Sequence, residues 1–338
     1  MAFEADWPAG DSEEVPHCPY CGNSERSLAY SAVRDWAFGS APGLWTYWSC
    51  SGCHGLYLSP RPTPASIGNA YSRYYTHDGD RSAGRLSAIK KRVRNEVWSN
   101  SLQTSLYPRL GLPKILAWTT QWLRPWIAEP FGLRQLAQLP KGLLIDVGCG
   151  NGNKIKLAEQ LGWQARGIEL DAAAVKAAVA QGLQVELGGF ELLANYEGQV
   201  DCLVCSHVLE HVHQPLRMIE LLLAALKPEG VLLLSLPNAA SFLRHHYGEN
   251  WRGLEAPRHL AIPDGVWLMD YLDRQGFDCT QVPSYPLETA IESERMRRRG
   301  ANVVAADIHA AKALLRGRPQ PAMAQQDVTQ LVCVRAAT

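Results

Sequence analysis

The sequence lacks long apolar runs, a basic leader and any excess of charge. No uncharged apolar run reaches the ~18 residues that suggest a membrane-spanning helix, so we expect no transmembrane segment. The acidic N-terminus, MAFEADWPAGDSEEV, has neither the basic flank nor the apolar stretch of a secretory signal. The 33 Lys and Arg residues balance the 33 Asp and Glu residues, so no global field attracts nucleic acid or an anionic membrane. These absences favour a cytoplasmic protein and disfavour nucleic acid as its partner.

The sequence also lacks internal repeats and low-complexity tracts, which argues against repeat architectures and largely disordered chains. Apolar residues make up 46% and charged residues 20% of the chain, as in folded globular proteins. Because 338 residues exceed what one ordinary core supports, we expect a main domain with one or two attachments.

The second half of the chain alternates short β-rich runs with helical ones. This alternation is the sequence form of a parallel sheet covered by helices on both faces. Asp171 can cap the start of the helix after the second strand, and Gly182 can end it. A Leu-rich helix from Pro215 stops at Pro228, before a turn that contains Gly230. We expect strands at residues 143–147, 165–170, 183–187, 200–206 and 231–237, then near 279–282 and at 328–334.

The first of these strands runs into a glycine-rich loop in the sequence LLIDVGCGNGN. Glycines allow a tight turn and a close approach of a ligand to the backbone, and the next helix offers free N–H groups. A nicotinamide-binding loop would read G-x-G-x-x-G, whereas this spacing and the acidic Asp146 suit a cationic amino-acid ligand better. Glu169, at the end of the second strand, can accept both ribose hydroxyls of a bound nucleoside. The loop glycines stand at alternate positions: Gly148, Gly150 and Gly152.

Four motifs in order, DVGCGNG, GIELD, SHVLEHV and LKPEGVLLLSLPN, make residues 140–280 resemble class I S-adenosylmethionine-dependent methyltransferases. The resemblance implies a Rossmann-like, doubly wound α/β fold with a seven-stranded sheet, and S-adenosyl-L-methionine as the cofactor. Many members hold the adenine amine with an acidic residue after the third strand, but this chain has Gly188 and Gly189 before Phe190 there. The carried-over cofactor-binding residues are Asp146, Gly148, Gly150 and Gly152 around the methionine part, Glu169 on the ribose, and Leu170, Phe190, Ser206 and His207 in the rest of the pocket.

Four cysteines fall in two close pairs, Cys18-Pro-Tyr-Cys21 and Cys50-Ser-Gly-Cys53. Two C-x2-C knuckles can supply the tetrahedral thiolates that Zn2+ prefers, and four thiolates leave no open position, so this zinc would be structural. Two disulfides or free thiols are the alternatives. The knuckles and the following GLYLSPRPTPASIGNAYSRYY resemble methyltransferases that carry an N-terminal zinc-binding module and act on sugars, polysaccharide precursors or natural products. The other cysteines are expected to be reduced core residues: Cys149, Cys202, Cys205, Cys279 and Cys333.

The chain is expected to have three parts. Residues 1–62 form the zinc-ribbon-like module, residues 63–139 a helical connector or lid, and residues 140–338 the S-adenosylmethionine-binding domain. Tryptophans recur in the connector every four residues, and three interpretations stay open for them: packing on the main domain, cover for an apolar substrate and peripheral contact with a membrane. They are Trp118, Trp122 and Trp126.

Histidines near the ends of the fourth and fifth strands are the candidate bases. A hydroxyl acceptor must lose a proton during methyl transfer, and a histidine with a near-neutral pKa can take it. His207 follows the fourth strand, where ligands of open parallel sheets bind, and His259 lies in the loop after the fifth. We expect one of these two to be catalytic. Three neighbours are expected to shape the acceptor site: Tyr247, Trp251 and Arg258.

The segment SHVLEHV has a second interpretation. His207, Glu210 and His211 resemble the position of the metal-binding Glu-x-x-Glu-His of ubiquinone-type O-methyltransferases, with His207 in place of the first Glu. Hydrogen bonding within the junction between helix and strand is the plainer alternative for Glu210 and His211.

These features together predict methyl transfer from S-adenosylmethionine to a small-molecule or saccharide acceptor, at a hydroxyl, with a histidine that removes the proton. An RNA-base methyltransferase is the alternative within catalysis, because some of these enzymes also place a Cys-rich zinc module before the fold. A non-catalytic protein that recruits a partner through the zinc module is the alternative of another class.

Overall fold

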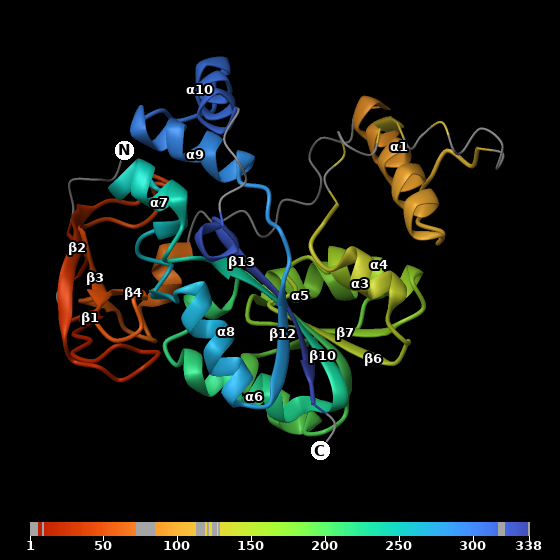
Figure 1. The fold of residues 1–338 in the computed structure, drawn as a ribbon, viewed down its shortest axis with the longest axis horizontal. Coiled ribbons are helices and arrows are strands. Elements are labelled where there is room, and N and C mark those ends of the chain that lie inside the picture. Colours follow the sequence, from red (N-terminus) through yellow and green to blue (C-terminus); the bar gives the residue numbers. More distant parts are fainter. Residues whose placement is uncertain are drawn as a thin grey trace. The chain divides into compact units, whose positions relative to one another are not determined.

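The main feature of the fold is a mixed seven-stranded sheet with the strand order β12-β13-β10-β9-β6-β7-β8 (Figure 1). The computed structural model of the chain describes residues 6–8, 10–71, 85–112, 119, 122–123, 127, 129–316 and 322–336. The strand order reverses beside β6, as in doubly wound α/β folds. The Rossmann-like seven-stranded sheet predicted from the sequence is therefore confirmed.

The strands of this sheet follow the apolar runs of the sequence. β6 and β9 have the predicted bounds, but β10 begins at Leu226, so the turn expected around Gly230 is already strand. The helix ends early because the carbonyls of Ala224 and Ala225 accept hydrogen bonds from the loop before β9, at Gly198 and Gln199. The strands are β6 (Leu143–Val147), β7 (Gln164–Glu169), β8 (Val185–Leu187), β9 (Val200–Ser206), β10 (Leu226–Pro237), β12 (Phe277–Gln281) and β13 (Val328–Arg335).

Helices connect the strands and continue after β10. The predicted cap at Asp171 is confirmed, because its side chain accepts hydrogen bonds from the backbone N–H groups of Ala173 and Ala174. The α-helices are α4 (Asn153–Gln160), α5 (Ala172–Val179), α6 (Pro215–Ala225), α7 (Phe242–Tyr247), α8 (Gly265–Arg274), α9 (Leu287–Arg297) and α10 (Ala305–Leu315). The short 3-10 helices are η1 (Ile67–Tyr71), η3 (Phe190–Tyr196), η4 (Leu209–His211), η5 (Gly248–Asn250), η6 (Arg252–Leu254) and η7 (Met323–Gln325).

The N-terminal region forms a four-stranded sheet with the order β11-β4-β3-β2. Its edge strand β11 comes from far later in the chain, after β10, and pairs antiparallel with β4. A separate pair joins β1 to β5. The strands are β1 (Ser12–Glu13), β2 (Arg26–Val33), β3 (Trp45–Cys50), β4 (Leu56–Leu58), β5 (Arg61–Pro62) and β11 (Ala261–Ile262).

By its internal contacts the chain forms two compact units, and each is described by itself. Unit 1 comprises Met1–Tyr74, Cys205–Leu223 and Leu234–Thr338, and unit 2 comprises Tyr75–Val204 and Ala224–Leu233. In unit 1 the N-terminal strands lie beside α7 (Figure 1), and their apolar residues share one core with the segment after β10. The three-part division expected from the sequence stays a prediction. Members of this shared core include Trp45, Tyr47, Leu56, Leu58, Leu243, Trp251 and Leu254.

The predicted connector contains α1 (Arg85–Leu102) and α3 (Leu133–Gln138). Of its tryptophan stripe, Trp122 is 80% exposed, while Trp118 and Trp126 lie outside the described residues. Within the described ranges, no helix is both long and apolar enough to cross a membrane.

Two cysteines expected to be reduced form a disulfide instead. Cys279 on β12 and Cys333 on β13 are direct partners in the antiparallel pair, with their Cα atoms 4.0 Å apart. This register brings the two sulfurs together, which spacing in the sequence could not indicate. The other three, Cys149, Cys202 and Cys205, are buried and stay outside the disulfide, as predicted.

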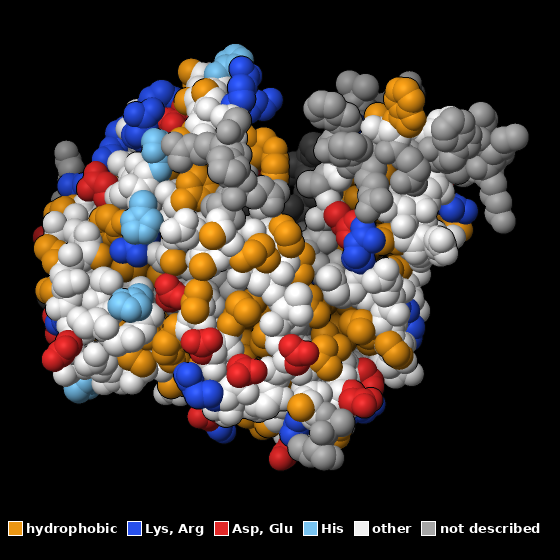
Figure 2. Space-filling model, viewed as in Figure 1, with side chains coloured by type: hydrophobic (Ala, Val, Ile, Leu, Met, Phe, Trp, Pro, Cys, Tyr) orange, Lys and Arg blue, Asp and Glu red, His pale blue; other side chains and the backbone are white. Residues whose placement is uncertain are grey.

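Several charged side chains on the surface form ion pairs. Figure 2 shows basic side chains gathered over α9 and α10, with acidic ones interspersed elsewhere on this face. Arg298 pairs with Asp307 at 2.9 Å, and Arg299 pairs with Glu249 at 3.2 Å. The basic side chains of this region are thus largely neutralised, in keeping with the balanced charge of the sequence.

The close packing of β7 predicts a sensitive glycine. A Cβ on Gly167 would lie 2.4 Å from the sulfur of Cys149 and 2.6 Å from Cδ1 of Ile155. We expect Gly167→Ala to lower the free energy of unfolding by about 1–3 kcal/mol, measured by urea denaturation. Gly68→Ala is the matched control, because a Cβ there would meet no atom within 4 Å. An equal loss in both variants would contradict the packing explanation.

Candidate functional site

The glycine loop at residues 148–152 connects β6 to α4 within unit 2. Its three glycines have positive φ values: 68° at Gly148, 52° at Gly150 and 75° at Gly152. A Cβ on Gly152 would lie 2.3 Å from Cδ1 of Leu183, whereas one on Gly150 would meet no atom within 4 Å. Packing therefore requires glycine at 152, and the loop at 150 borders open space that a ligand can enter.

Two carboxylates of unit 2 flank the loop in opposite environments. Asp146 on β6 is 4% exposed, and burial raises the pKa of its carboxyl to about 6. Glu169 at the end of β7 accepts hydrogen bonds of 2.7 Å from the N–H of Gly150 and 2.9 Å from the N–H of Asp171. A carboxylate has about four lone-pair sites, so Glu169 can hold the loop and still accept two ligand hydroxyls.

The other two predicted cofactor residues of unit 2 offer apolar surface. Leu170 directly follows β7, and 74% of its surface is exposed. Phe190 begins η3 and is half-buried. Apolar side chains at such a position can pack on the faces of a planar ring.

In unit 1, the end of β9 presents Ser206 and His207. The backbone of His207 is left-handed, with a φ of 57°, and its N–H donates a 2.7 Å hydrogen bond to the carbonyl of Ser235. Its Nδ1 lies 3.2 Å from Oε1 of Glu210. The imidazole is 51% exposed while the Glu210 carboxylate is fully buried, so a buried carboxylate orients an accessible ring.

His259, also in unit 1, lies in a different environment. Its side chain is 5% exposed, and its Nδ1 is 2.7 Å from the carbonyl of Gly253. Its Nε2 lies 3.6 Å from Oε2 of Glu255 and 4.0 Å from Oε1 of Glu210. Burial lowers the pKa of His259 to about 4, so the ring is neutral at pH 7.

The three residues expected to shape the acceptor site are buried, which corrects that expectation. Trp251 donates a 2.8 Å hydrogen bond from Nε1 to Asp327, and the hydroxyl of Tyr247 bonds to Glu294 at 3.1 Å. Side chains held in the core by protein partners fix the backbone around His259 instead of contacting an acceptor. Arg258, the third residue, is fully buried as well.

The partner of Arg258 is Asp35, which the sequence did not indicate. The two guanidinium Nη atoms lie 2.5 and 3.0 Å from the two carboxylate oxygens of Asp35, and Nε lies 3.1 Å from Glu255. Burial opposes ionisation of Asp35, but the hydrogen bonds and charge of Arg258 hold the pKa of that carboxyl below its usual value. This buried pair fastens the segment that carries His259 to the N-terminal region.

The four paired cysteines meet in unit 1, as the zinc prediction requires. The sulfurs of Cys18 and Cys53 are 3.4 Å apart, as are those of Cys21 and Cys50, and all four lie within 4.8 Å of one another. A tetrahedral zinc with Zn–S bonds of ~2.3 Å separates its sulfurs by about 3.8 Å. The hydrogen bond between Cys18 and Cys53 lowers the pKa of Cys18 to about 5 and raises the pKa of Cys53.

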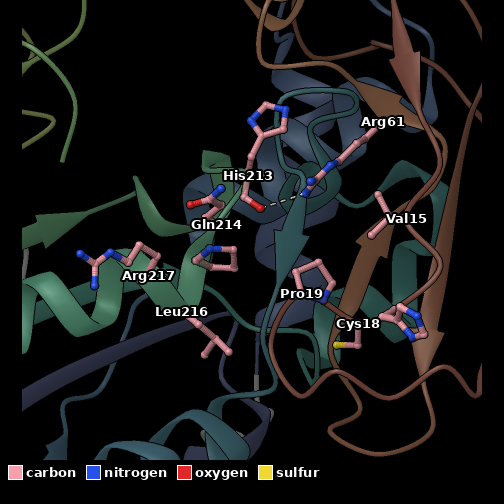
Figure 3. Close-up of a pocket in the computed structure, with 10 residues that line it drawn as sticks. Val15, Cys18, Pro19, Arg61, His213, Gln214, Leu216 and Arg217 are labelled. Atoms are coloured by element: carbon pink, nitrogen blue, oxygen red, sulfur yellow. Dashed lines mark hydrogen bonds between the residues drawn. The ribbon is translucent and has the colours of Figure 1, made fainter. Parts of the chain in front are cut away.

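A cavity of about 400 Å³ lies beside the first knuckle, also in unit 1 (Figure 3). Arg61 borders it and donates a 3.2 Å hydrogen bond to the carbonyl of His213. The same guanidinium is already paired with Glu13 at 2.8 Å. The cavity is lined by Val15, His17, Cys18, Pro19, Arg61 and residues 213–217.

The buried pair of Asp35 and Arg258 leads to a prediction on stability. We expect Arg258→Ala to lower the free energy of unfolding by about 3–5 kcal/mol, because it leaves a buried carboxylate without its cation. Arg217→Ala is the control, since Arg217 and Glu220 form a surface pair in which both side chains are 56% exposed. That change should cost less than about 1 kcal/mol in the same urea titration. Similar losses in the two variants would contradict the assigned role of Arg258.

The middle of the chain is similar to proteins of a known family. Residues 126–282 match the model of a protein family described as "Methyltransferase domain". The ubiquinone biosynthesis O-methyltransferase of Xanthomonas campestris pv. campestris (strain B100) is 35% identical over 107 residues, which is 30% of this chain and 45% of that protein. The enzyme of the same name from Xanthomonas axonopodis pv. citri (strain 306) is 35% identical over 117 residues, 32% of this chain and 45% of that protein. The chain thus matches about half the length of these curated relatives.

Solved structures with a similar chain path include S-adenosylmethionine-dependent methyltransferases from two organisms. The protein from Archaeoglobus fulgidus is 17% identical with a TM-score of 0.41, over 64% of this chain and 92% of that one. The protein from Mesorhizobium loti is 18% identical with a TM-score of 0.42, over 60% of this chain and 96% of that one. Residues 126–282 therefore match a methyltransferase domain, and the seven-stranded sheet has the Rossmann-like α/β fold of methyltransferases.

Proposed function

We propose that this protein transfers a methyl group from S-adenosylmethionine to a hydroxyl oxygen of a small-molecule or saccharide acceptor. The observation that carries the proposal is the glycine loop between a buried acid, Asp146, and a ribose-competent acid, Glu169. The names of the Xanthomonas relatives, which are O-methyltransferases, support oxygen as the acceptor atom.

Each part of the cofactor has a matching feature in unit 2. Asp146 lies at the start of the loop, where its carboxylate would attract the ammonium group of the methionine part. Gly150 leaves the space that close approach to the backbone needs. Glu169 would accept the ribose hydroxyls, and the exposed Leu170 with Phe190 would pack on the adenine. When bound, the cofactor supplies a methyl group on a sulfonium, which has a good leaving group.

His207 is the better candidate for the base that removes the acceptor proton. It is half-exposed, so an acceptor can reach it, and the carboxylate of Glu210 on Nδ1 would make Nε2 the nitrogen that takes the proton. His259 is buried and has a pKa of about 4, which makes it a weak base at neutral pH. Of the two histidines expected from the sequence as candidate bases, we therefore keep His207.

A structural zinc ion held by Cys18, Cys21, Cys50 and Cys53 is the second part of the proposal. The spacing of the sulfurs supports it, and four thiolates leave no position for a substrate. The ion would stabilise an N-terminal module whose sheet also contains β11.

The cofactor assignment predicts opposite effects of one substitution on affinity and stability. We expect Asp146→Asn to weaken S-adenosylmethionine binding about 10–100-fold in isothermal titration calorimetry, because a charge-assisted hydrogen bond is lost. Without ligand, the variant should be more stable than the parent at pH 7, because it no longer buries a charge. Asp273→Asn, which removes an exposed carboxylate, should change neither quantity. Unchanged affinity in Asp146→Asn would refute the cofactor assignment.

The raised pKa of Asp146 also predicts a pH dependence. The folded state holds this proton up to pH about 6, whereas the unfolded chain releases it near 3.8, so this group lowers stability as the pH rises between these values. Only the ionised carboxylate attracts an ammonium group. Affinity for S-adenosylmethionine should therefore fall as the pH drops from 7 to below 6. A flat affinity from pH 5 to 7 would contradict this role.

The choice of base is tested by turnover. We expect His207→Ala to lower kcat about 10²–10⁴-fold while the Kd for S-adenosylmethionine stays unchanged. The assay follows release of S-adenosylhomocysteine with a panel of catechols, phenols and saccharides. His246→Ala, at an exposed histidine on α7, is the control and should retain full turnover. Parent-like turnover in His207→Ala would exclude it as the base, and no release with any acceptor would reject hydroxyl methylation.

A further inference from the structure

A disulfide joins the two strands at one edge of the main sheet. Cys279 on β12 and Cys333 on β13 lie directly opposite each other in this antiparallel pair (Figure 1). In the strand order of the sheet, β12 is the edge strand. Both strands belong to unit 1. Neither cysteine takes part in the proposed methyl transfer.

A thiol in solution can reach this disulfide at the edge of the sheet. Cys279 is half-buried, and its neighbours Asp278 and Thr280 are exposed. Cys333, on the inner strand, is fully buried. Thiol–disulfide exchange begins when a thiolate attacks one of the two sulfurs, and its rate depends on access to that sulfur. The sulfur of Cys279 is therefore the point of attack.

The two strands are also held together by their backbones. Antiparallel pairing with β13 covers all of β12, from Phe277 to Gln281. It continues with a 2.8 Å hydrogen bond from the N–H of Val282 to the carbonyl of Gln330. After reduction this pairing would keep the two thiols opposite each other. The bond can then form again in an intramolecular step, at a high effective concentration of the second thiol.

The other seven cysteines of the chain lie outside the disulfide. Four of them form the proposed zinc site, which requires thiolates. Compartments that keep such thiols reduced contain low-molecular-weight thiols, which also attack a disulfide that they can reach. The disulfide is thus the cysteine pair that a change in redox conditions converts first.

We propose that Cys279 and Cys333 form a reversible thiol–disulfide switch, which a low-molecular-weight thiol such as glutathione reduces. A glutathione thiolate attacks the sulfur of Cys279, which forms a mixed disulfide and releases the thiolate of Cys333. A second glutathione thiolate attacks the glutathione sulfur of the mixed disulfide, so that glutathione disulfide and the thiolate of Cys279 are released. The two protons lost by the glutathione thiols go to the two cysteines. Glutathione disulfide re-forms the bond by the reverse steps.

The switch would act on the segment from Ser241 to Trp251, which contains α7 and η5. After β12, the N–H of Ser284 donates a 2.7 Å hydrogen bond to the side chain of Gln326. The next residue, Asp327, directly precedes β13 and accepts hydrogen bonds of 2.8 Å from the side chains of Ser241 and Trp251. The disulfide therefore restrains the two strands whose ends hold this segment. Reduction would let β12 move relative to β13, and the segment would gain mobility.

This switch goes beyond the proposed function, from which it takes only the reduced state of the four paired cysteines. The competing explanation is a permanent structural cross-link. A permanent cross-link resists small thiols as long as the protein stays folded. Reduction of the folded protein therefore distinguishes the two explanations, whatever the methyl acceptor is.

The experiment uses the full-length protein loaded with Zn2+, without oxygen, in buffers of increasing ratio of reduced to oxidised glutathione. Thiols are trapped with N-ethylmaleimide, and peptide mass spectrometry measures the fraction of Cys279 and Cys333 present as dithiol. We expect this fraction to exceed about 90% at about 10 mM reduced glutathione, with unchanged far-UV circular dichroism and bound zinc. Addition of oxidised glutathione should restore the disulfide.

Reduction should also change stability and mobility in defined places. We expect a melting temperature lower by about 5–10 °C, because the cross-link that restrains the unfolded chain is lost. Hydrogen exchange should become about 10-fold faster or more in β12 and in the segment from Ser241 to Trp251. Exchange in α5, which belongs to unit 2, should not change.

A double variant, Cys279→Ser with Cys333→Ser, is the matched control. It keeps every other cysteine and cannot form the disulfide. Its melting temperature should equal that of the reduced parent and should not depend on the glutathione ratio. A dependence in this variant like that of the parent would assign the effect to the zinc thiolates and would overturn the proposal.

Three further outcomes would overturn it. In the first, the disulfide of the folded protein survives about 10 mM reduced glutathione and is reduced only after unfolding in urea. In the second, reduction of the native protein is accompanied by loss of zinc and of the circular dichroism signal. In the third, the segment from Ser241 to Trp251 exchanges at the same rate in the reduced and oxidised states.

Discussion

The buried pair of Arg258 and Asp35 is the constraint on which the histidine environment depends. Both side chains are fully buried, and they lie 223 residues apart in the sequence. Replacing such a pair by apolar residues is often neutral or stabilising, so its value here is more in geometry than in energy. Arg258 adjoins His259, and its carbonyl also contacts His211. One guanidinium thus fixes the N-terminal region and the backbone around both histidines.

The two acidic residues that flank the glycine loop of unit 2, Asp146 and Glu169, suit different parts of a ligand. Glu169 is satisfied by backbone N–H groups, which hold the loop in shape before any ligand arrives. Asp146 is buried, and its raised pKa reflects the free-energy cost of a charged carboxylate in that environment. A bound ammonium group would remove that cost. The site is therefore rigid where a neutral ribose would bind and electrostatically incomplete where a cation would bind.

Local patterns predicted much of the fold because they report on single elements. The bounds of β6 and β9 follow from apolar runs, and the cap at Asp171 follows from its side-chain chemistry. Pairings between distant segments left no such signal. Neither the disulfide between β12 and β13 nor the partner of Arg258 could be derived from spacing. The sequence also could not show which of His207 and His259 is the better candidate base, because the two residues differ in burial and not in residue type.

Two residues with strained backbone lie next to the same side chains. His207 and Glu255 adopt positive φ values of 57° and 37°, which residues with a Cβ adopt only at a cost of about 1–3 kcal/mol each. The side chain of His207 contacts Glu210, and the side chain of Glu255 contacts His259. Relaxing either backbone would remove a charged or titratable neighbour from Glu210 or His259. The surrounding core holds both in place, which is expected where the position of a few polar atoms matters more than local stability.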